Sequence, residues 1–291
     1  MQNLHIYQSL WAMELRSPDL PERSFEESFQ MVADAAYDGM CIDPGVDEIE
    51  RFQQLRPLFD RHGLGCMVNA FPYQLDDMQP LLALAKDFNA SLVNVIGGVM
   101  PIAVADAVPV VARWTDDAEQ AGLPLLFETH RDSLLNDLYY TLQLLDLAPD
   151  MRLCADLSHF VVDREMRSPI TATDEDFIGR ILQQSDCFQG RIANREQIQV
   201  QIEFPQHQEW VRIFKRWWKS GMRAWRRRSA NDATLIFLCE LGPPPYAMTD
   251  RNRRELSDRW EEALQIRDWV RDIWRELEQE EASMSKAKHR A

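Results

Sequence analysis

The chain has 291 residues, of which 45% are hydrophobic and 27% charged, the ordinary balance of a globular protein with a sizeable core. Its 47 acidic and 32 basic residues give a formal net charge of −15, which disfavours a general nucleic-acid binder because duplex binding depends on a basic surface. No segment approaches the roughly 20 consecutive apolar residues of a membrane-spanning helix, and the N-terminal segment lacks the order of a secretory signal. We therefore expect a soluble, cytoplasmic protein with no membrane or nucleic-acid partner.

Short runs rich in apolar and β-branched residues recur along the chain and predict strands. The five cysteines lie singly within these runs and form no CxxC pair, so we expect them to be buried thiols of a reducing compartment. The predicted strands cover residues 5–12, 39–43, 65–71, 92–98, 124–129, 151–157, 187–193 and 234–240.

Longer segments with apolar residues at helical spacing separate the strands. Ser24 and Glu27 have the spacing of a capping box, and Gly63 and Gly122 stand where helices would end. The predicted helices cover residues 24–37, 46–62, 75–88, 103–121, 133–146, 173–184, 206–228 and 254–280. Repeated strand–helix units without a linker predict the α/β class and a single (β/α)8 TIM barrel over residues 1–280, followed by a polar tail at 281–291 that we expect to be disordered.

An open, doubly wound sheet is the alternative architecture for the same alternation. Such a sheet normally carries a glycine-rich phosphate-binding turn after an early strand. Neither GxGxxG nor GxxxxGK[ST] occurs in the chain. The closed barrel is therefore the favoured prediction.

Three carboxylates stand at the ends of predicted strands: Glu128, Asp156 and Glu240. The carboxyl ends of barrel strands form the active-site face, so these groups should lie close together. Like charges in a buried pocket repel, and a divalent cation neutralises them while using their oxygens as ligands. The pattern predicts a metal site. The alternative is that each acid caps a helix or pairs with an arginine such as Arg131 or Arg191.

Four segments, FETHRD, CADLSHF, GRIANREQIQV and CELGPPPY, follow one another in the chain. In order and spacing they resemble the motifs of the xylose isomerase-like TIM-barrel superfamily, the sugar phosphate isomerase/epimerase group. The resemblance spans nearly the whole chain. The resemblance strongly implies the barrel fold. It says little about the substrate, because proteins with this fold catalyse several kinds of reaction.

The resemblance also implies one divalent metal ion held by Glu128, Asp156, a histidine of the seventh strand and Glu240. This chain has Gln189 in place of that histidine, followed two residues later by Arg191. A glutamine oxygen can still ligate a cation, and an all-oxygen set favours Mn²⁺ or Mg²⁺ over Zn²⁺. We therefore expect Gln189 to complete a modified metal site.

By the same resemblance, the chain is expected to be an isomerase or epimerase, or a related lyase, acting on a small carbohydrate or polyol derivative. Glu128 and Glu240 would remove and return a proton next to a carbonyl through a metal-stabilised enediolate. Residues expected to hold substrate oxygens are His159, Arg191, His130 and Tyr246. Glu14, Trp11, Asn69 and Asn94 are further pocket candidates, for which we favour packing or capping roles.

Residues 210–228 are basic and rich in tryptophan, in contrast to the acidic whole. One interpretation is a surface for an anionic partner. The spacing favours another, a buried helical face formed by Trp210, Phe214, Trp217, Gly221 and Trp225. The cations would then pair with acidic residues of 255–281, or the segment would form a homodimer interface.

Two other functions are less favoured. A phosphodiesterase resembling endonuclease IV would need three zinc ions and many histidines, whereas the chain has six histidines and a net charge of −15. A non-catalytic barrel that binds a sugar-like ligand or a partner would have lost its chemistry with the change to Gln189.

Overall fold

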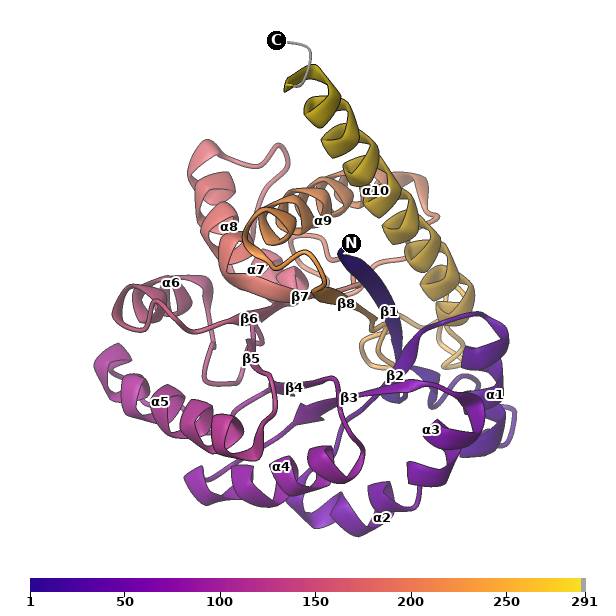
Figure 1. The fold of residues 1–291 in the computed structure, drawn as a ribbon. Coiled ribbons are helices and arrows are strands. Elements are labelled where there is room, and N and C mark those ends of the chain that lie inside the picture. Colours follow the sequence, from indigo (N-terminus) through magenta and orange to yellow (C-terminus); the bar gives the residue numbers. More distant parts are fainter. Residues whose placement is uncertain (289–291) are drawn as a thin grey trace.

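The computed structural model describes the backbone of residues 1–288 and the side chains of residues 1–283. Parallel strands pair in chain order and β8 closes on β1, which gives a closed barrel surrounded by helices (Figure 1). The prediction of a single (β/α)8 TIM barrel of the α/β class is confirmed, and each predicted strand overlaps an observed one. The strands are β1 (Asn3–Ser9), β2 (Gly39–Ile42), β3 (Gly65–Ala70), β4 (Leu92–Val95), β5 (Leu125–Glu128), β6 (Leu153–Ala155), β7 (Ser185–Gln189) and β8 (Thr234–Cys239).

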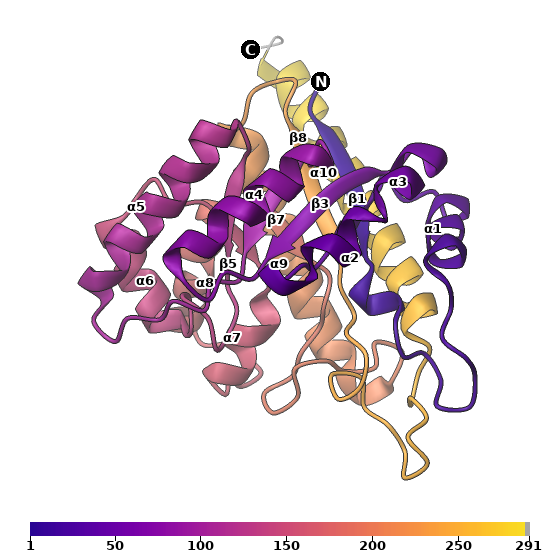
Figure 2. The same cartoon turned by 90° about the horizontal axis from the view of Figure 1, so that it is seen from below.

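The helices follow the strands around the outside of the barrel (Figures 1 and 2). The α-helices are α1 (Phe25–Asp34), α2 (Ile49–Gln53), α3 (Arg56–His62), α4 (Met78–Asp87), α5 (Val104–Ala121), α6 (Leu138–Leu147), α7 (Leu157–Asp163), α8 (Ala172–Gln184), α9 (Gln208–Arg228) and α10 (Arg259–Lys288). Short 3₁₀ helices lie at Trp11–Met13, Val46–Glu48, Leu75–Asp77 and Pro205–His207. Residues 281–288, assigned from the sequence to the polar tail, continue α10, and residues 289–291 lie outside the described part of the chain.

Local signals fix several helix ends as expected. Ser24 and Glu27 form the capping box of α1, with the Ser24 hydroxyl accepting from Glu27 N and the Glu27 carboxylate accepting from Ser24 N. Gly63 and Gly122 terminate α3 and α5 with positive φ angles of 64° and 73°, a conformation that glycine adopts without strain.

The inside of the barrel is filled by a compact set of apolar side chains from alternate strand positions. Tyr7 occupies one end of this core, where Gly39 and Gly65 leave room for its ring because a Cβ at either position would overlap it. The Tyr7 hydroxyl lies 3.1 Å from Ser91 Oγ, so the buried phenol has a hydrogen-bond partner. All five cysteines are buried free thiols, as predicted. The inner core comprises Tyr7, Cys41, Met67, Leu92, Leu126, Cys154, Cys187, Ile236 and Leu238.

The basic, tryptophan-rich segment forms α9, and its predicted apolar face is buried. Its cations pair across the helix interface with α10: Lys219 Nζ lies 2.8 Å from Glu276 and 2.9 Å from Glu280, and Arg223 lies 2.8 Å from Glu280. Arg226 adds a pair with Glu281 at 2.5 Å. The favoured structural interpretation of this segment is therefore confirmed.

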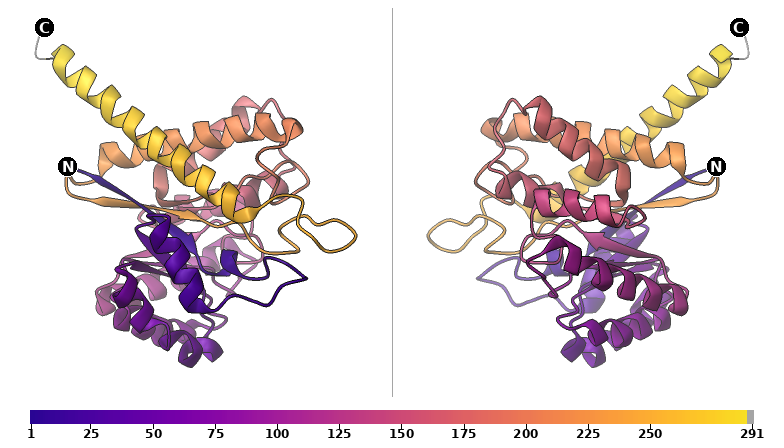
Figure 3. Two further views of the ribbon diagram at one scale, coloured as in Figure 1. Left: turned by 90° about the vertical axis from the view of Figure 1, so that its right-hand side faces the viewer. Right: turned by 90° about the vertical axis from the view of Figure 1, so that its left-hand side faces the viewer.

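The carboxyl ends of the strands open at the end of the barrel opposite the N-terminus, where the loops after β1 and β8 project (Figure 3). The far end of α10 extends beyond the barrel on the other side, near the N-terminus (Figure 3). Among the described helices, none combines the length and apolar character needed to cross a bilayer.

Candidate functional site

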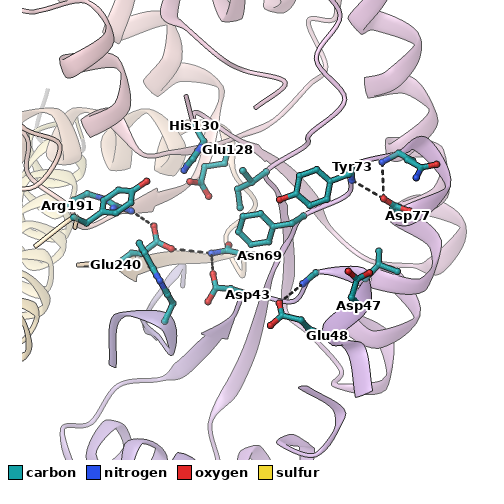
Figure 4. Close-up of a pocket in the computed structure, with 17 residues that line it drawn as sticks. Asp43, Asp47, Glu48, Asn69, Tyr73, Asp77, Glu128, His130, Arg191 and Glu240 are labelled. Carbon is teal, nitrogen blue, oxygen red and sulfur yellow. Dashed lines mark hydrogen bonds and ion pairs between the residues drawn. The ribbon is translucent and has the colours of Figure 1, made fainter. Parts of the chain in front are cut away.

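A cavity of about 750 Å³ lies at the carboxyl ends of the strands. Its floor carries carboxylates from β5 and β8, and its rim is aromatic (Figure 4). A concave site of this size with convergent polar groups is typical of a small-molecule pocket. The lining residues are Trp11, Asp43, Gly45, Val46, Asp47, Glu48, Asn69, Phe71, Tyr73, Gln74, Asp77, Ile96, Glu128, His130, Arg191, Glu240 and Tyr246.

Glu128 is the last residue of β5, and its side chain is buried at the cavity floor. Its Oε2 atom accepts hydrogen bonds from Asn94 Nδ2 at 2.5 Å and from Gln189 Nε2 at 2.7 Å. Burial raises the pKa of Glu128 well above its usual value, and the nearby charges of Glu240 and Asp156 raise it further. The protonated form of Glu128 is therefore favoured relative to that of an ordinary glutamate.

Asp156 follows β6 directly and is the N-cap of α7. Its Oδ1 atom accepts from Ser158 N at 2.9 Å and from Ser158 Oγ at 2.5 Å, which satisfies the first turn of the helix. Its Oδ2 atom accepts from Arg191 Nε at 3.1 Å. The structure therefore matches the alternative prediction for Asp156, which caps a helix and pairs with an arginine.

Glu240 follows β8 and faces Glu128 across the cavity floor (Figure 4). Its Oε2 atom accepts from Arg191 Nη2 at 2.6 Å and its Oε1 atom from Asn69 Nδ2 at 3.2 Å. Burial raises the pKa of Glu240 to about 8, against the opposing effect of the Arg191 guanidinium. One carboxylate oxygen from each of Glu128, Asp156 and Glu240 lies within 4.8 Å of the others, so the three acids predicted from strand ends do converge.

Side-chain amides connect the two glutamates. Asn69 Nδ2 donates to Glu240 and also to Asp43 Oδ1 at 2.8 Å, while Asn69 Oδ1 accepts from Asn94 Nδ2 at 2.9 Å. Because Asn94 donates in turn to Glu128, a chain of amides joins both acids. The packing role favoured for Asn69 and Asn94 is wrong, since both hold the carboxylates.

Asp43 is a site residue that the sequence analysis did not identify. It follows β2 directly, so the rule that selected the other three strand-end acids would have found it. Burial raises its pKa to about 7. Its Oδ2 atom has no hydrogen-bond partner among the described residues.

Gln189 ends β7 and turns its amide nitrogen toward Glu128. Its Oε1 atom is buried and has no partner within the described residues. Such an oxygen is costly to leave unpaired, and a rotation of the amide would aim it at the carboxylates. The four predicted ligands, Glu128, Asp156, Gln189 and Glu240, thus lie together and offer only oxygen atoms, a set that fits a hard divalent cation.

The rings of His130 and His159 lie with centroids 3.9 Å apart, and the peptide of Arg131 fixes their tautomers. His130 Nδ1 lies 2.5 Å from the Arg131 carbonyl, which only accepts, so this nitrogen carries the proton and Nε2 has a free lone pair. His159 Nδ1 lies 3.3 Å from the Arg131 amide, which only donates, so His159 Nε2 carries the proton. Burial lowers the pKa of His130 to about 4 and that of His159 well below its usual value, so both rings are neutral.

Glu128, His130 and His159 form a second group with ligand atoms within 4.8 Å of one another. The tautomer of His159 points a proton, and not a lone pair, at this space. Only Glu128 and His130 of this group can therefore ligate a cation as they stand. Of the histidines that the structure describes, only His130 lines the cavity, and His159 is buried against the His130 ring, which leaves too few histidines for a histidine-rich, three-zinc site.

Arg191 and Tyr246 complete the set of predicted substrate contacts. Arg191 lies between Asp156 and Glu240, with its guanidinium 4.7 Å from the Tyr246 ring centroid and 5.8 Å from that of Trp11. The Trp11 and Tyr246 rings meet edge to face at 5.2 Å. The loop after β8 thus places Tyr246 at the cavity, while the substrate contacts themselves stay a prediction.

No protein-family model matches the sequence, and no curated protein matches it either. Solved structures match over almost the whole chain. A xylose isomerase-like TIM barrel protein from Mycobacterium smegmatis, in complex with magnesium, has a TM-score of 0.61 at 15% identity and covers 92% of this chain and 97% of its own. D-allulose 3-epimerase from Methylomonas sp., in complex with D-allulose, has a TM-score of 0.62 at 12% identity, covering 93% and 97%.

A third match is D-psicose 3-epimerase from Clostridium cellulolyticum H10, solved with D-tagatose. It has a TM-score of 0.56 at 12% identity, covering 93% of this chain and 99% of its own. These identities are too low to carry an activity from one protein to another. What the likeness establishes is the architecture: the chain has the fold of the xylose isomerase-like TIM barrels, among which its structural neighbours are sugar isomerases and epimerases.

Proposed function

We propose that the protein is a sugar isomerase or epimerase that moves a proton next to the carbonyl of a small carbohydrate or polyol derivative. One observation carries the proposal: Glu128 and Glu240, from β5 and β8, are buried on opposite sides of one cavity floor and are held by a shared chain of amides. Structures with this fold include epimerases solved with ketoses, which supports the substrate class.

The two glutamates supply the proton transfer. The pKa of Glu240 is raised to about 8, so this group exchanges protons near neutral pH, where an ordinary glutamate is fully ionised, and the pKa of Glu128 is raised by the same burial. One ionised glutamate would remove the proton from carbon on one face of the substrate, and the other, protonated, would return a proton. The amide donors of Asn94 and Asn69 orient the carboxylates toward the cavity.

Donors at the cavity mouth would hold the substrate oxygens. Arg191 lines the cavity, and its Nη1 atom has no hydrogen-bond partner among the described residues. The protonated His159 Nε2 also lacks a hydrogen bond there, but it is not one of the lining residues and lies 3.5 Å from Asp156 Oδ2. His130 Nε2 would accept from a hydroxyl group. Tyr246 and Trp11 would cover the sugar and exclude water, which strengthens each polar contact beneath them.

A divalent cation fits the same site. Glu128, Asp156, Gln189 and Glu240 would hold it, and the hardness of four oxygen ligands favours Mn²⁺ or Mg²⁺ over Zn²⁺. When bound, the cation would supply Lewis-acid polarisation of the substrate carbonyl and hydroxyl oxygens. The acid–base roles remain with Glu128 and Glu240.

A non-catalytic barrel that binds a sugar-like ligand is the second candidate. Two observations favour it. Arg191 donates to both Asp156 and Glu240, and the Gln189 amide nitrogen donates to Glu128, so all three acids have hydrogen-bond partners without a cation.

Exchange of solvent deuterium into ketoses separates these functions. The protein with Mn²⁺ is incubated in D2O with D-fructose, D-allulose or D-tagatose, and the loss of proton signals at carbons next to the carbonyl is followed by NMR. We expect exchange that is abolished by Glu128→Gln and by Glu240→Gln and unchanged by Glu119→Gln, an exposed glutamate of α5. Saturable ketose binding without exchange would favour the non-catalytic barrel, and exchange that survives both active-site variants would refute the assigned roles.

A further inference from the structure

The Arg191 guanidinium occupies the position between two of the predicted cation ligands. Its side chain is 2% exposed, with Nε 3.1 Å from Asp156 Oδ2 and Nη2 2.6 Å from Glu240 Oε2. Asp156 and Glu240 are themselves buried. A fork of donors that bridges two buried carboxylates is a strong, geometrically specific arrangement.

Both carboxylates have every oxygen engaged in this arrangement. Asp156 uses Oδ1 for Ser158 and Oδ2 for Arg191, while Glu240 uses Oε1 for Asn69 and Oε2 for Arg191. Each oxygen can accept a further contact, but a cation that takes an oxygen from each acid must share the negative charge of that acid with Arg191. Two positive groups on the same pair of carboxylates repel each other at close range, which favours displacement of the guanidinium from the acids.

We infer that Arg191 is an internal cation that competes with a divalent cation for Asp156 and Glu240, and so sets how tightly the site binds that cation. This inference rests on the proposed function, because it concerns the cation of the same site. It assigns Arg191 a positioning role in addition to the predicted contact with substrate.

Aromatic rings at the cavity would hold the Arg191 guanidinium after its displacement from the acids. Arg191 already lies against the Tyr246 and Trp11 rings, at 4.7 and 5.8 Å from their centroids, and aromatic faces hold a guanidinium by cation–π attraction. Its Nη1 atom has no partner among the described residues, and Arg191 lines the cavity. After displacement, the donors now directed at the two acids would be free for an oxygen of the substrate.

Competition predicts an unusual response to mutation. Loss of an ordinary ligand or of a substrate contact weakens cation binding or leaves it unchanged. Loss of Arg191 instead leaves the buried acids without their positive partner, which costs stability until a cation supplies positive charge. Cation affinity should therefore rise and the cation-free protein should become less stable.

The test is calorimetric titration of Mn²⁺ into the chelator-stripped protein, compared among the parent, Arg191→Met and Arg191→Lys. We expect Arg191→Met to lower the Kd by about tenfold or more, because breaking a buried charge pair has large effects. Arg191→Lys should lie between the two, since an ammonium keeps the charge but loses the fork.

Arg131→Met is the matched control. Arg131 also lies near the Tyr246 ring, at 5.6 Å, but forms no ion pair with a carboxylate in the described chain. Its loss removes the same charge from a half-buried position near the same rings, and we expect the Kd to change by less than about twofold because Arg131 pairs with none of the acids that would hold the cation. An equal gain in both methionine variants would show a general charge effect and overturn the competition.

Thermal unfolding gives a second readout. Without cation, Arg191→Met should melt below the parent, and Mn²⁺ should raise its melting temperature by more than that of the parent. If Arg191→Met folds only with Mn²⁺ present, that dependence itself supports the inference, and Arg191→Lys supplies the affinity. Equal affinity in the parent and Arg191→Met would overturn this inference and leave the proposed function standing, whereas no Mn²⁺ binding in any variant would overturn both.

Discussion

Replacement of Glu262 by glutamine should make the stability of the protein less dependent on pH. Glu262 is buried on α10, and its Oε1 atom accepts from Ile202 N at 3.0 Å. Burial raises the pKa of Glu262 from 4.5 to about 7, and the charges of Glu203 and Glu255 raise it further against the hydrogen bonds from Ile202 and Ser257. The ionised form of Glu262 is therefore disfavoured in the folded protein.

The sign of the effect follows from proton uptake. Between pH 4.5 and about 7, the folded state holds a proton on Glu262 that the unfolded state has lost, so stability falls as the pH rises through this range. A shift of one pKa unit corresponds to about 1.4 kcal/mol, so the full change is about 3 kcal/mol and is complete above the folded-state pKa. Glutamine stays neutral and keeps an oxygen for Ile202 N. Glu262→Gln should thus equal the parent at pH 4 and exceed it by about 2–3 kcal/mol at pH 8.5.

Urea unfolding of the parent and of Glu262→Gln at several pH values between 4 and 8.5 measures this difference. Glu261→Gln, an exposed position next to it on the same helix, is the control and should change stability by less than about 0.5 kcal/mol at every pH. A stability difference between Glu262→Gln and the parent that does not vary with pH would refute the reasoning.

Three further substitutions test the stability of the fold and the composition of the site. Arg259 donates to the Glu14 carbonyl at 2.8 Å from a buried position, so Arg259→Met should cost about 3–5 kcal/mol in urea unfolding, and a loss below about 1 kcal/mol would contradict that role. Gly221 packs against the Phe188 ring with no room for a Cβ, so Gly221→Ala should cost about 1–3 kcal/mol, and an unchanged melting temperature would show that the contact yields. Gln189→His should raise Zn²⁺ affinity relative to Mg²⁺ in parallel calorimetric titrations, because imidazole is the softer ligand, and unchanged selectivity would place Gln189 outside the cation site.

The strand-end acids were predictable because their positions follow from backbone topology alone. Parallel strands of a closed barrel end at the same face, so a carboxylate at the last residue of β5 and one directly after each of β6 and β8 had to reach one mouth. Applied to β2, the same rule would have selected Asp43. The amide chain through Asn69 and Asn94 was not predictable, because each amide meets partners from several strands and only the closed barrel brings them within hydrogen-bond distance.

Short and polar helical segments explain the differences in secondary structure. Helix α7 was not predicted, because its seven residues after the Asp156 cap contain only one helical repeat of apolar residues, at Leu157, Phe160 and Val161. Near the C-terminus, the polar composition favoured a disordered tail from residue 281. Instead, Glu281 pairs with Arg226, and α10 continues to Lys288. An ion pair between distant segments is a tertiary contact that composition does not report.

Under the proposed function, the strand-end acids form one site with two states. Arg191 pairs with Asp156 and Glu240 in the first, and a cation would bind the acids in the second. Glutamine suits such a site better than histidine would. The Gln189 amide donates to Glu128 while Arg191 holds the other two acids, and after rotation the same amide presents an oxygen to a cation. A neutral imidazole turned toward Glu128 offers either a proton or a lone pair at that nitrogen, and the change between them requires a different partner on its far side. The change to Gln189 and the burial of Arg191 are therefore consistent with each other, because together they stabilise the cation-free site without removing its ligands.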